Sequence, residues 1–362
     1  MLVLEAIDGG FLSTIQDHGR KGYLRYGVPH SGAIDPFAHR VSNILLGNPS
    51  DSATIEVTLP GARFKVLTDT VVAVTGADLG CELNNVRMEP WQPFPVPAGG
   101  ILSFTSSHSG MRSYIAIVGG FEAPLVLGSR ATYTRAKLGG LSGRKLYMGD
   151  RLSSRMTEMP ENILAFRCPP ELIPPQSSHL ELRVVLGPQD AYFTSDGVET
   201  FLNSSYNITD HADRTGYRLS GPPIAHKEGA DILSDGNPLG AVQVAGDGMP
   251  MVLLADRGTT GGYTKIATVI GVDVPKLAQA CPGDQVTFTE VGLDEANSLY
   301  ALQEYALAAI TQTTPVVYGR RRLRMRIGAV DQEVVTSFLD LSADINEDDI
   351  HLAATAWLAE RE

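Results

Sequence analysis

One ten-residue stretch combines several residue types that can bind an anion or activate a carbonyl group. It reads Asp256-Arg257-Gly258-Thr259-Thr260-Gly261-Gly262-Tyr263-Thr264-Lys265, and apolar runs flank it on both sides. Arg257 and Lys265 supply positive charge, and the paired glycines let backbone N–H groups approach a ligand closely. We expect a loop between two buried strands that binds an anion or takes part in catalysis. The plainer alternative is a tight turn.

A hairpin is expected immediately before this stretch. Asp247-Gly248 is a hairpin-turn signal between the apolar runs Val242–Val244 and Val252–Leu254. If the two runs pair, Gln243 lies in the middle of a strand, and the ten-residue stretch leaves the far strand end. Asp247 and Asp256 are then candidate carboxylates for orienting a cation or accepting a proton. Asp256 is equally suited to an ion pair with Arg214.

A second polar stretch, residues 14–35, lies between an expected strand and an expected helix. Asp35 is the predicted N-cap of that helix, with Pro36 at its first position and Gly47 at its end. Free N–H groups of the first turn, together with Arg20, can hold an anion or a carbonyl oxygen. The alternative is a long loop held in place by Asp17 and Arg20.

A third candidate is the basic, glycine-rich connection at residues 112–149. Long connections in compact domains often carry function, so this one is a candidate substrate loop. Arg130 is its leading residue because it lies in the tight turn Gly128-Ser129-Arg130. The alternative is an exposed loop whose cations are only solvated.

Several well-known site types are absent from the sequence. There is no GxxxxGK[ST] phosphate loop, no GxSxG motif and no HExxH motif. His18, His30 and His211 lack metal-ligand spacing, so no metal is expected. No lysine lies between methionines in a hairpin context, so covalent biotin on this chain is not expected.

Composition narrows the class of partner. The 362 residues carry a net charge of −12, which makes a nucleic-acid partner unfavourable. The N-terminus does not resemble a signal peptide, and no apolar run approaches the length of a membrane span. Cys81, Cys168 and Cys281 are far apart in the sequence and are expected to be unpaired thiols in a cytoplasmic protein.

Short β-branched runs between frequent glycines and prolines predict a mainly β fold with a few helices. An internal repeat is expected, because residues 17–23, 55–57, 72–78 and 97–104 resemble residues 210–217, 242–244, 252–256 and 282–288 in the same order. The predicted domains are 1–168, 179–294 and a C-terminal extension, 295–362. Beyond the second domain we expect a helix, a strand pair and a final helix, at residues 293–310, 320–327 with 333–338, and 347–361.

Several of these segments together resemble one known family. They include TIQDHGRKGYLRYGVPHSGAIDPFA, NILLGNPSDSATIEVTLPG, RSYIAIVGGF, LGSRATYTRAKLGGLSGR, DRTGYRLSGPP and LLADRGTTGGYTKIATVI. The chain resembles, over about residues 1–290, the allophanate-hydrolase-subunit-2 family, also called the biotin-dependent carboxyltransferase family. Stand-alone bacterial members of that family are known as the 5-oxoprolinase C subunit. The resemblance implies two cyclophilin-like β-barrels in tandem.

The resemblance also implies partners and two alternative activities. One is ATP-dependent opening of 5-oxoproline to glutamate, together with an allophanate-hydrolase-subunit-1-like chain and a further oxoprolinase subunit that share the ATP. The other is transfer of a carboxyl group from carboxybiotin to urea or a similar amide. A third reading, from another class, is a non-catalytic regulator that binds a kinase-inhibitor-like partner. The absence of a fused biotin carboxylase or carrier favours the oxoprolinase.

The candidate site residues form two sets. The expected catalytic set is Asp17, Arg20, Asp247, Asp256, Arg257 and Lys265. The expected substrate- or nucleotide-binding set is Ser31, Gly32, Arg130, Arg214, Tyr217, Gln243, Thr260, Gly261, Gly262 and Tyr263.

Overall fold

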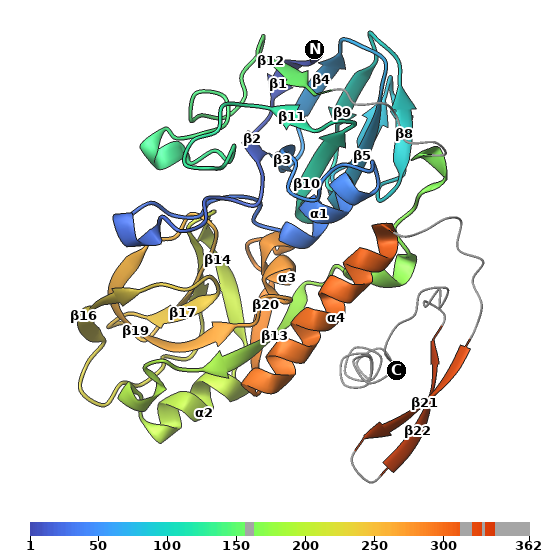
Figure 1. Ribbon diagram of the computed structural model, residues 1–362. Helices are drawn as coiled ribbons and strands as arrows, with labels where there is room; N and C mark the ends of the chain where they lie inside the picture. Colours follow the sequence, from blue (N-terminus) through green and yellow to red (C-terminus); the bar gives the residue numbers. More distant parts are fainter. Residues whose placement is uncertain (156–162, 312–320, 328–329, 337–362) are drawn as a thin grey trace. The chain divides into compact units, whose positions relative to one another are not determined.

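The computed structural model describes residues 1–155, 163–311, 321–327 and 330–336. The chain forms two compact units, Met1–Glu290 and Val291–Glu362. Within the first unit, strands β1–β12 and β13–β20 form two groups, blue to green and green to orange (Figure 1). Strands dominate and helices are few, which confirms the predicted mainly β fold with β units in tandem. The two groups follow the order of the first two predicted domains, and buried contacts join them within one compact unit. The predicted domain boundaries stay a prediction.

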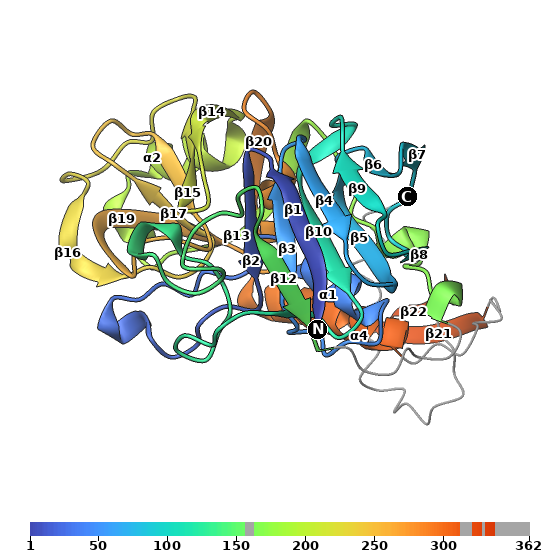
Figure 2. The same cartoon turned by 90° about the horizontal axis from the view of Figure 1, so that it is seen from above.

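The first group consists of two sheets packed on each other. Its strands are β1 (Leu2–Gly9), β2 (Leu12–Gln16), β3 (Thr54–Thr58), β4 (Ala62–Val66), β5 (Thr70–Asp78), β6 (Cys81–Leu83), β7 (Val86–Arg87), β8 (Pro93–Val96), β9 (Ile101–Phe104), β10 (Ser109–Ile117), β11 (Phe121–Glu122) and β12 (Arg151–Ser154). One sheet has the order β11-β12-β1-β4-β9-β6-β7 and the other β2-β3-β10-β5-β8. Strands of the two sheets, such as β1 and β4 of the first and β3 and β10 of the second, are seen in Figure 2. Both sheets contribute apolar side chains to one core, such as Leu4 and Phe64 from the first and Ile55 and Ile115 from the second.

The second group closes into a barrel. Its strands are β13 (His179–Leu186), β14 (Tyr206–Ala212), β15 (Gly216–Ser220), β16 (Asp231–Gly236), β17 (Ala241–Val244), β18 (Pro250–Leu253), β19 (Thr260–Val269) and β20 (Gln285–Glu290). The order β13-β20-β14-β15-β18-β17-β19 closes because β13 also pairs with β19, and β16 extends the sheet beyond β19. The expected hairpin is confirmed, since Val242 pairs with Val252 across β17 and β18.

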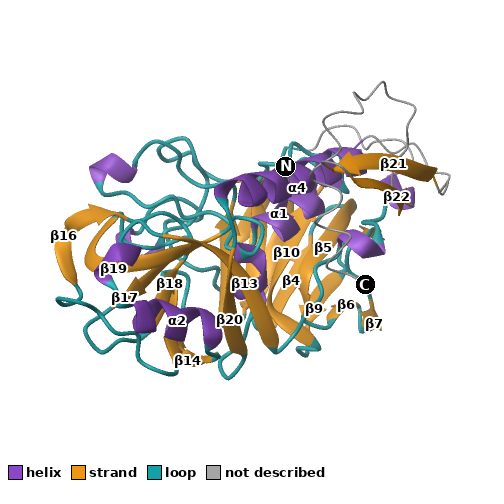
Figure 3. Cartoon of the chain, turned by 90° about the horizontal axis from the view of Figure 1, so that it is seen from below, coloured by secondary structure: helices purple, strands orange, loops and turns teal. Residues whose placement is uncertain are grey.

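Three helices of the first unit cover strand faces. Helix α1 (Pro36–Ile44) begins where the sequence predicts, because the Asp35 side chain accepts a hydrogen bond from the N–H of Ala38. It lies against β5 and β10 (Figure 3). Helix α2 (Ser195–Asn203) packs on β20, and α3 (Val274–Gln279) contacts β10 of the first group. Short 3₁₀ turns occur at Leu24–Tyr26, Thr134–Ala136, Ile163–Ala165, Pro170–Leu172 and Asp190–Tyr192.

The second unit contains helix α4 (Leu293–Thr311) and a strand pair, β21 (Arg321–Ile327) with β22 (Val330–Thr336). These elements confirm the predicted helix and the predicted strand pair. The final helix predicted at residues 347–361 lies outside the described residues. Among the described helices, none is long and apolar enough to span a bilayer.

Candidate functional site

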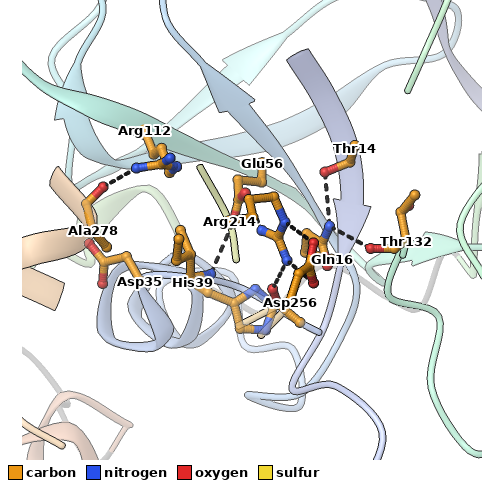
Figure 4. Close-up of polar contacts among 12 residues, drawn as sticks. Thr14, Gln16, Asp35, His39, Glu56, Arg112, Thr132, Arg214, Asp256 and Ala278 are labelled. Carbon is orange, nitrogen blue, oxygen red and sulfur yellow. Dashed lines mark hydrogen bonds and ion pairs between the residues drawn. The ribbon is translucent and has the colours of Figure 1, made fainter. Parts of the chain in front are cut away.

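Two buried arginines join the strand groups by crossing in opposite directions. Arg214, between β14 and β15, donates to Glu56 of β3 at 2.5 Å and to the carbonyl oxygen of Gly32 at 2.6 Å. Its Nε also pairs with Asp256 at 2.9 Å (Figure 4). From the other side, Arg112 of β10 donates to the Tyr217 hydroxyl at 2.6 Å and to a carbonyl oxygen of α3.

Glu56 is the acidic centre of this interface. Its side chain is fully buried and also accepts hydrogen bonds from the N–H of Ile34 at 3.1 Å and from the Tyr114 hydroxyl at 2.8 Å. Burial raises the pKa of Glu56, but the positive charges of Arg214 and Arg112 outweigh burial and leave the pKa below its ordinary value. The carboxylate is therefore ionised and tightly held.

Gln279 of α3 adds a neutral link across the same interface. Its side-chain oxygen accepts from the backbone N–H groups of Met111 and Arg112, at 3.1 and 2.9 Å. Its amide nitrogen donates to Asp35 at 2.8 Å. Burial, reinforced by the nearby charge of Glu56, raises the pKa of Asp35 to about 6 despite its hydrogen bonds to Ala38 and Gln279.

These contacts explain where three predicted site residues lie. Arg214 uses all three guanidinium nitrogens, and the ion pair with Asp256 that the sequence allowed is confirmed. The Tyr217 hydroxyl accepts from Arg112. All three side chains make contacts at the interface between the two strand groups, and their role in the site stays a prediction.

Arg257 has a different environment from the interface arginines. It is 2% exposed, and it donates from Nε to the carbonyl oxygen of Asn237 at 2.8 Å and from Nη1 to that of Leu254 at 3.2 Å. Within the part of the chain that the structure describes, no carboxylate forms an ion pair with it. Burial lowers the pKa of Arg257 to about 10, so the guanidinium stays charged at neutral pH.

Lys265 lies on β19, where its side chain is fully buried. Its Nζ makes no hydrogen bond to any described residue, and the Asp235 carboxylate lies 3.6 Å away. Gln243 is the cross-strand neighbour of Lys265 and donates to the Asn237 side chain at 3.1 Å. Gln189 joins them, because its side-chain oxygen accepts from the N–H of Lys265 at 3.1 Å and its amide nitrogen donates to Asp235 at 3.3 Å. We call this group the Arg257–Lys265 cluster; its members are Gln189, Asp235, Asn237, Gln243, Arg257 and Lys265.

The paired glycines do not form the expected loop. Gly261 and Gly262 belong to strand β19, and Gly261 is the register partner of Asp235 in β16. The loop prediction is wrong for residues 260–265, because β16 supplies a pairing partner that is distant in sequence. A Cβ at Gly261 would lie 2.6 Å from the Gln243 amide nitrogen, so this glycine makes room for the cluster. Thr260 and Tyr263, in the same strand, are exposed.

The loop after β2 is anchored by two buried side chains. Asp17 accepts from the N–H of Gly19 at 2.8 Å, from the Ser129 hydroxyl at 2.6 Å and from the N–H of Arg130 at 2.5 Å. Arg20 is fully buried and donates from Nη2 to the carbonyl oxygen of Ala131, while its Nε and Nη1 find no partner among the described residues. Asp17 and Arg20 thus hold residues 129–131 rather than each other.

His30 and Ser31 bring this loop against the second barrel. The N–H of Ser31 donates to the carbonyl oxygen of Ala255 at 3.1 Å, one residue before Asp256. Ser31 has a φ of 53°, and its buried hydroxyl is without a partner in the described structure. Burial, followed by the charge of Arg257, lowers the pKa of the half-buried His30. No motif singled out His30 in the sequence, and its only signal was its position next to Ser31-Gly32.

The structure does not bring every predicted residue to this region. Asp247 is exposed in the β17–β18 turn, where it accepts from the N–H of Met249 at 2.9 Å. It therefore lies at the opposite end of β18 from Arg257. Arg130 is half-buried beside Asp17, which places it with the loop after β2. Over the described residues, no group of three acidic, histidine or cysteine side chains is arranged to hold a metal ion.

Replacing Arg214 with methionine leaves Glu56 and Asp256 buried without their cationic partner. We expect the free energy of unfolding to fall by about 3–5 kcal/mol, measured by urea denaturation. Arg135→Met is the matched control, because the Arg135–Asp213 pair is about 60% exposed on both sides and should contribute less than about 1 kcal/mol. Similar losses in the two variants would contradict the interface role.

The raised pKa of Asp35 predicts a specific pH dependence of stability. A carboxyl group with a folded-state pKa of about 6, against 3.8 for the free side chain, favours folding when protonated. That contribution is complete below about pH 4 and is lost as pH rises to about 6. Asp35→Asn keeps an N-cap without the titration. We expect the unfolding free energy of wild type minus variant to decrease from pH 4 to pH 7, and a constant difference would refute this.

Comparison with known proteins places this geometry in a family context. The chain matches the family described as "Carboxyltransferase domain, subdomain A and B" over residues 26–290. The 5-oxoprolinase C subunit of Escherichia coli is 35% identical over 297 residues, which cover 81% of this chain and 93% of that protein. The 5-oxoprolinase C subunit of Haemophilus influenzae is 34% identical over 85% of this chain and is itself covered to 97%.

Solved structures share the fold. The Kluyveromyces lactis urea amidolyase superposes with a TM-score of 0.81 at 29% identity, over 88% of this chain and 20% of that chain. The urea carboxylase of the same yeast gives a TM-score of 0.80 at 27% identity, over 92% of this chain and 32% of that chain. This chain thus spans about a fifth to a third of those larger proteins. By its sequence match and its paired β units, the chain belongs to the carboxyltransferase subdomain A and B family.

Proposed function

We propose that this chain is a subunit of an ATP-dependent 5-oxoprolinase, which opens 5-oxoproline to glutamate. The observation that carries the proposal is the near-complete coverage of two bacterial 5-oxoprolinase C subunits by a chain of similar extent. Arg257 is buried without a carboxylate partner among the described residues, and Lys265 Nζ makes no hydrogen bond and has only the exposed Asp235 carboxylate, at 3.6 Å. Both cations support the proposal, because they can stabilise oxygen atoms that gain negative charge.

The cluster residues have distinct roles in this proposal. ATP, when bound, supplies a phosphoryl group that activates the lactam carbonyl oxygen. Lys265 Nζ and the Arg257 guanidinium donate hydrogen bonds to the oxygens that carry charge, while Asn237 and Gln243 hold Arg257 and the strand face in place. Because these donors are ordered by the fold before a ligand arrives, little reorganisation is needed during the reaction.

We propose that activity requires partner chains. An allophanate-hydrolase-subunit-1-like chain and a further oxoprolinase subunit are the proposed companions, and they share the ATP. We also propose a cytoplasmic location, consistent with the free thiols of Cys81, Cys168 and Cys281. The proposal includes no covalently bound biotin on this chain.

The second candidate function is carboxyl transfer to urea or a similar amide. The observation that favours it is the superposition on urea amidolyase and urea carboxylase over most of this chain. The two candidates differ in their co-reactant, because carboxyl transfer requires carboxybiotin on another chain. A regulatory role, in which the chain only binds a kinase-inhibitor-like partner, predicts neither activity.

The deciding experiment is co-expression with the two proposed partner subunits. We expect glutamate formation from 5-oxoproline that requires ATP, and no biotin-dependent use of urea. Carboxylation of urea with a biotin carboxylase and carrier would favour the second candidate instead. Stable assembly with neither activity would support the regulatory role.

Within the reconstituted complex, Lys265→Gln and Arg257→Gln should each lower kcat/KM for 5-oxoproline by about a hundredfold, as expected for loss of one preorganised donor. Arg63→Gln and Lys65→Gln are matched controls, because both side chains are exposed on β4. Assembly and thermal unfolding report whether each variant folds. Unchanged kinetics in well-folded Lys265 and Arg257 variants would remove both residues from the proposed mechanism.

A further inference from the structure

The charge balance around the buried arginines differs from site to site. Arg183 binds Asp273 through several hydrogen bonds, the shortest at 2.8 Å, and Arg214 binds both Glu56 and Asp256. Burying a cation is unfavourable unless an anion or a set of acceptors compensates for the lost water. For Arg257, the described residues provide two carbonyl oxygens and no carboxylate. None of them accepts a hydrogen bond from its Nη2.

Two further polar groups without partners lie next to Arg257. The Ser31 hydroxyl is buried and unbonded in the described structure, and the backbone of Ser31 is hydrogen-bonded to Ala255. The His30 imidazole likewise makes no hydrogen bond to a described residue. The charge of Arg257 acts on it and contributes to lowering its pKa. Buried polar groups in folded proteins are normally paired, so the buried Ser31 hydroxyl lacks the partner that such a group usually has. Arg257 Nη2 and the half-buried His30 imidazole add two donor groups that no described residue uses.

The backbone supports this placement of Ser31. Its φ of 53° is unfavourable for a residue other than glycine. The conformation persists because the chain on both sides is fixed. The N–H of Ser31 binds Ala255, and the Gly32 carbonyl oxygen accepts from Arg214 at 2.6 Å. The same guanidinium binds Asp256, so Arg214 holds the Ser31 segment and the Arg257 segment together.

We propose that His30, Ser31 and Arg257 form an oxyanion-binding subsite where the two strand groups meet. Arg257 Nη2, the Ser31 hydroxyl and one N–H of a neutral imidazole are donors, and together with a positive charge they match the oxygens of a carboxylate or a phosphate group. The identity of the ligand at this subsite rests on the proposed function. It assigns Arg257 to binding the carboxylate of 5-oxoproline or a phosphate group of ATP.

The test measures anion binding directly, apart from catalysis. Dissociation constants of 5-oxoproline, 2-pyrrolidone and inorganic phosphate are measured by calorimetry for the full chain and for the reconstituted complex. 2-Pyrrolidone has the same lactam ring without the carboxylate. The variants are Arg257→Gln, Arg257→Lys and Ser31→Gly, with Arg63→Gln as the control. Glycine suits the positive φ of residue 31, so this change removes the hydroxyl without backbone conflict.

We expect wild-type protein to bind at least one of the anions, and Arg257→Gln to weaken that binding by about tenfold or more. Ser31→Gly should weaken the same anion by about threefold, and 2-pyrrolidone should be unaffected by either change. A loss confined to 5-oxoproline identifies a carboxylate subsite, and a loss confined to phosphate identifies a phosphate subsite. Either result supports the proposal.

The proposal fails if neither the chain nor the complex binds an anion, or if Arg257→Gln unfolds like wild type and binds anions equally well. If Arg257→Gln does not fold, full anion affinity in both Arg257→Lys and Ser31→Gly overturns it. The kinetic assay separates this failure from failure of the proposed function. Anion binding that depends on Arg257, without ATP-dependent glutamate formation, keeps the subsite and rejects the oxoprolinase. If ATP-dependent glutamate formation is unchanged in the Arg257 and Ser31 variants, the subsite is rejected and the oxoprolinase proposal stands.

Discussion

The guanidinium of Arg214 is the contact on which the candidate site depends. It binds Glu56 in the first strand group, Asp256 in the second, and the Gly32 carbonyl oxygen between β2 and α1. Two of these acceptors adjoin segments of the candidate site. Gly32 follows Ser31, and Asp256 precedes Arg257. Because a guanidinium is planar and its donors have fixed directions, one side chain sets the mutual position of three segments.

Buried charge has two different uses in this protein. At the interface, opposite charges are matched, as shown by the lowered pKa of Glu56 beside Arg214 and Arg112. In the Arg257–Lys265 cluster, carbonyl oxygens hold the Arg257 guanidinium, and the carboxylate nearest to Lys265 Nζ, that of Asp235, is 56% exposed. Matched ion pairs stabilise a folded interface, whereas buried cations without a buried acid beside them can still bind an anionic ligand.

Much of the fold was predictable because it depends on local sequence. The Asp35 cap with Pro36, the Asp247-Gly248 turn and the helix of residues 293–311 each have signals within a few residues. The alternation of short apolar runs with turns predicted a mainly β chain. Glu56 in β3 and Gln243 in β17 are polar residues in the middle of short apolar strands, and they occupy matching positions of the predicted internal repeat.

The sequence by itself determined the residue types that carry charge, the strands and helix caps, and the family. Only the tertiary structure decided which of those charges are neutralised. Arg214 and Arg257 look equally suitable in sequence, yet Arg214 meets two acids and Arg257 meets none among the described residues. In the structure, Gly261 lies in strand β19 rather than in a loop, and His30 lies near enough to Arg257 for its charge to lower the pKa of the imidazole. These outcomes depend on contacts between segments far apart in the chain, for which local pattern contains no information.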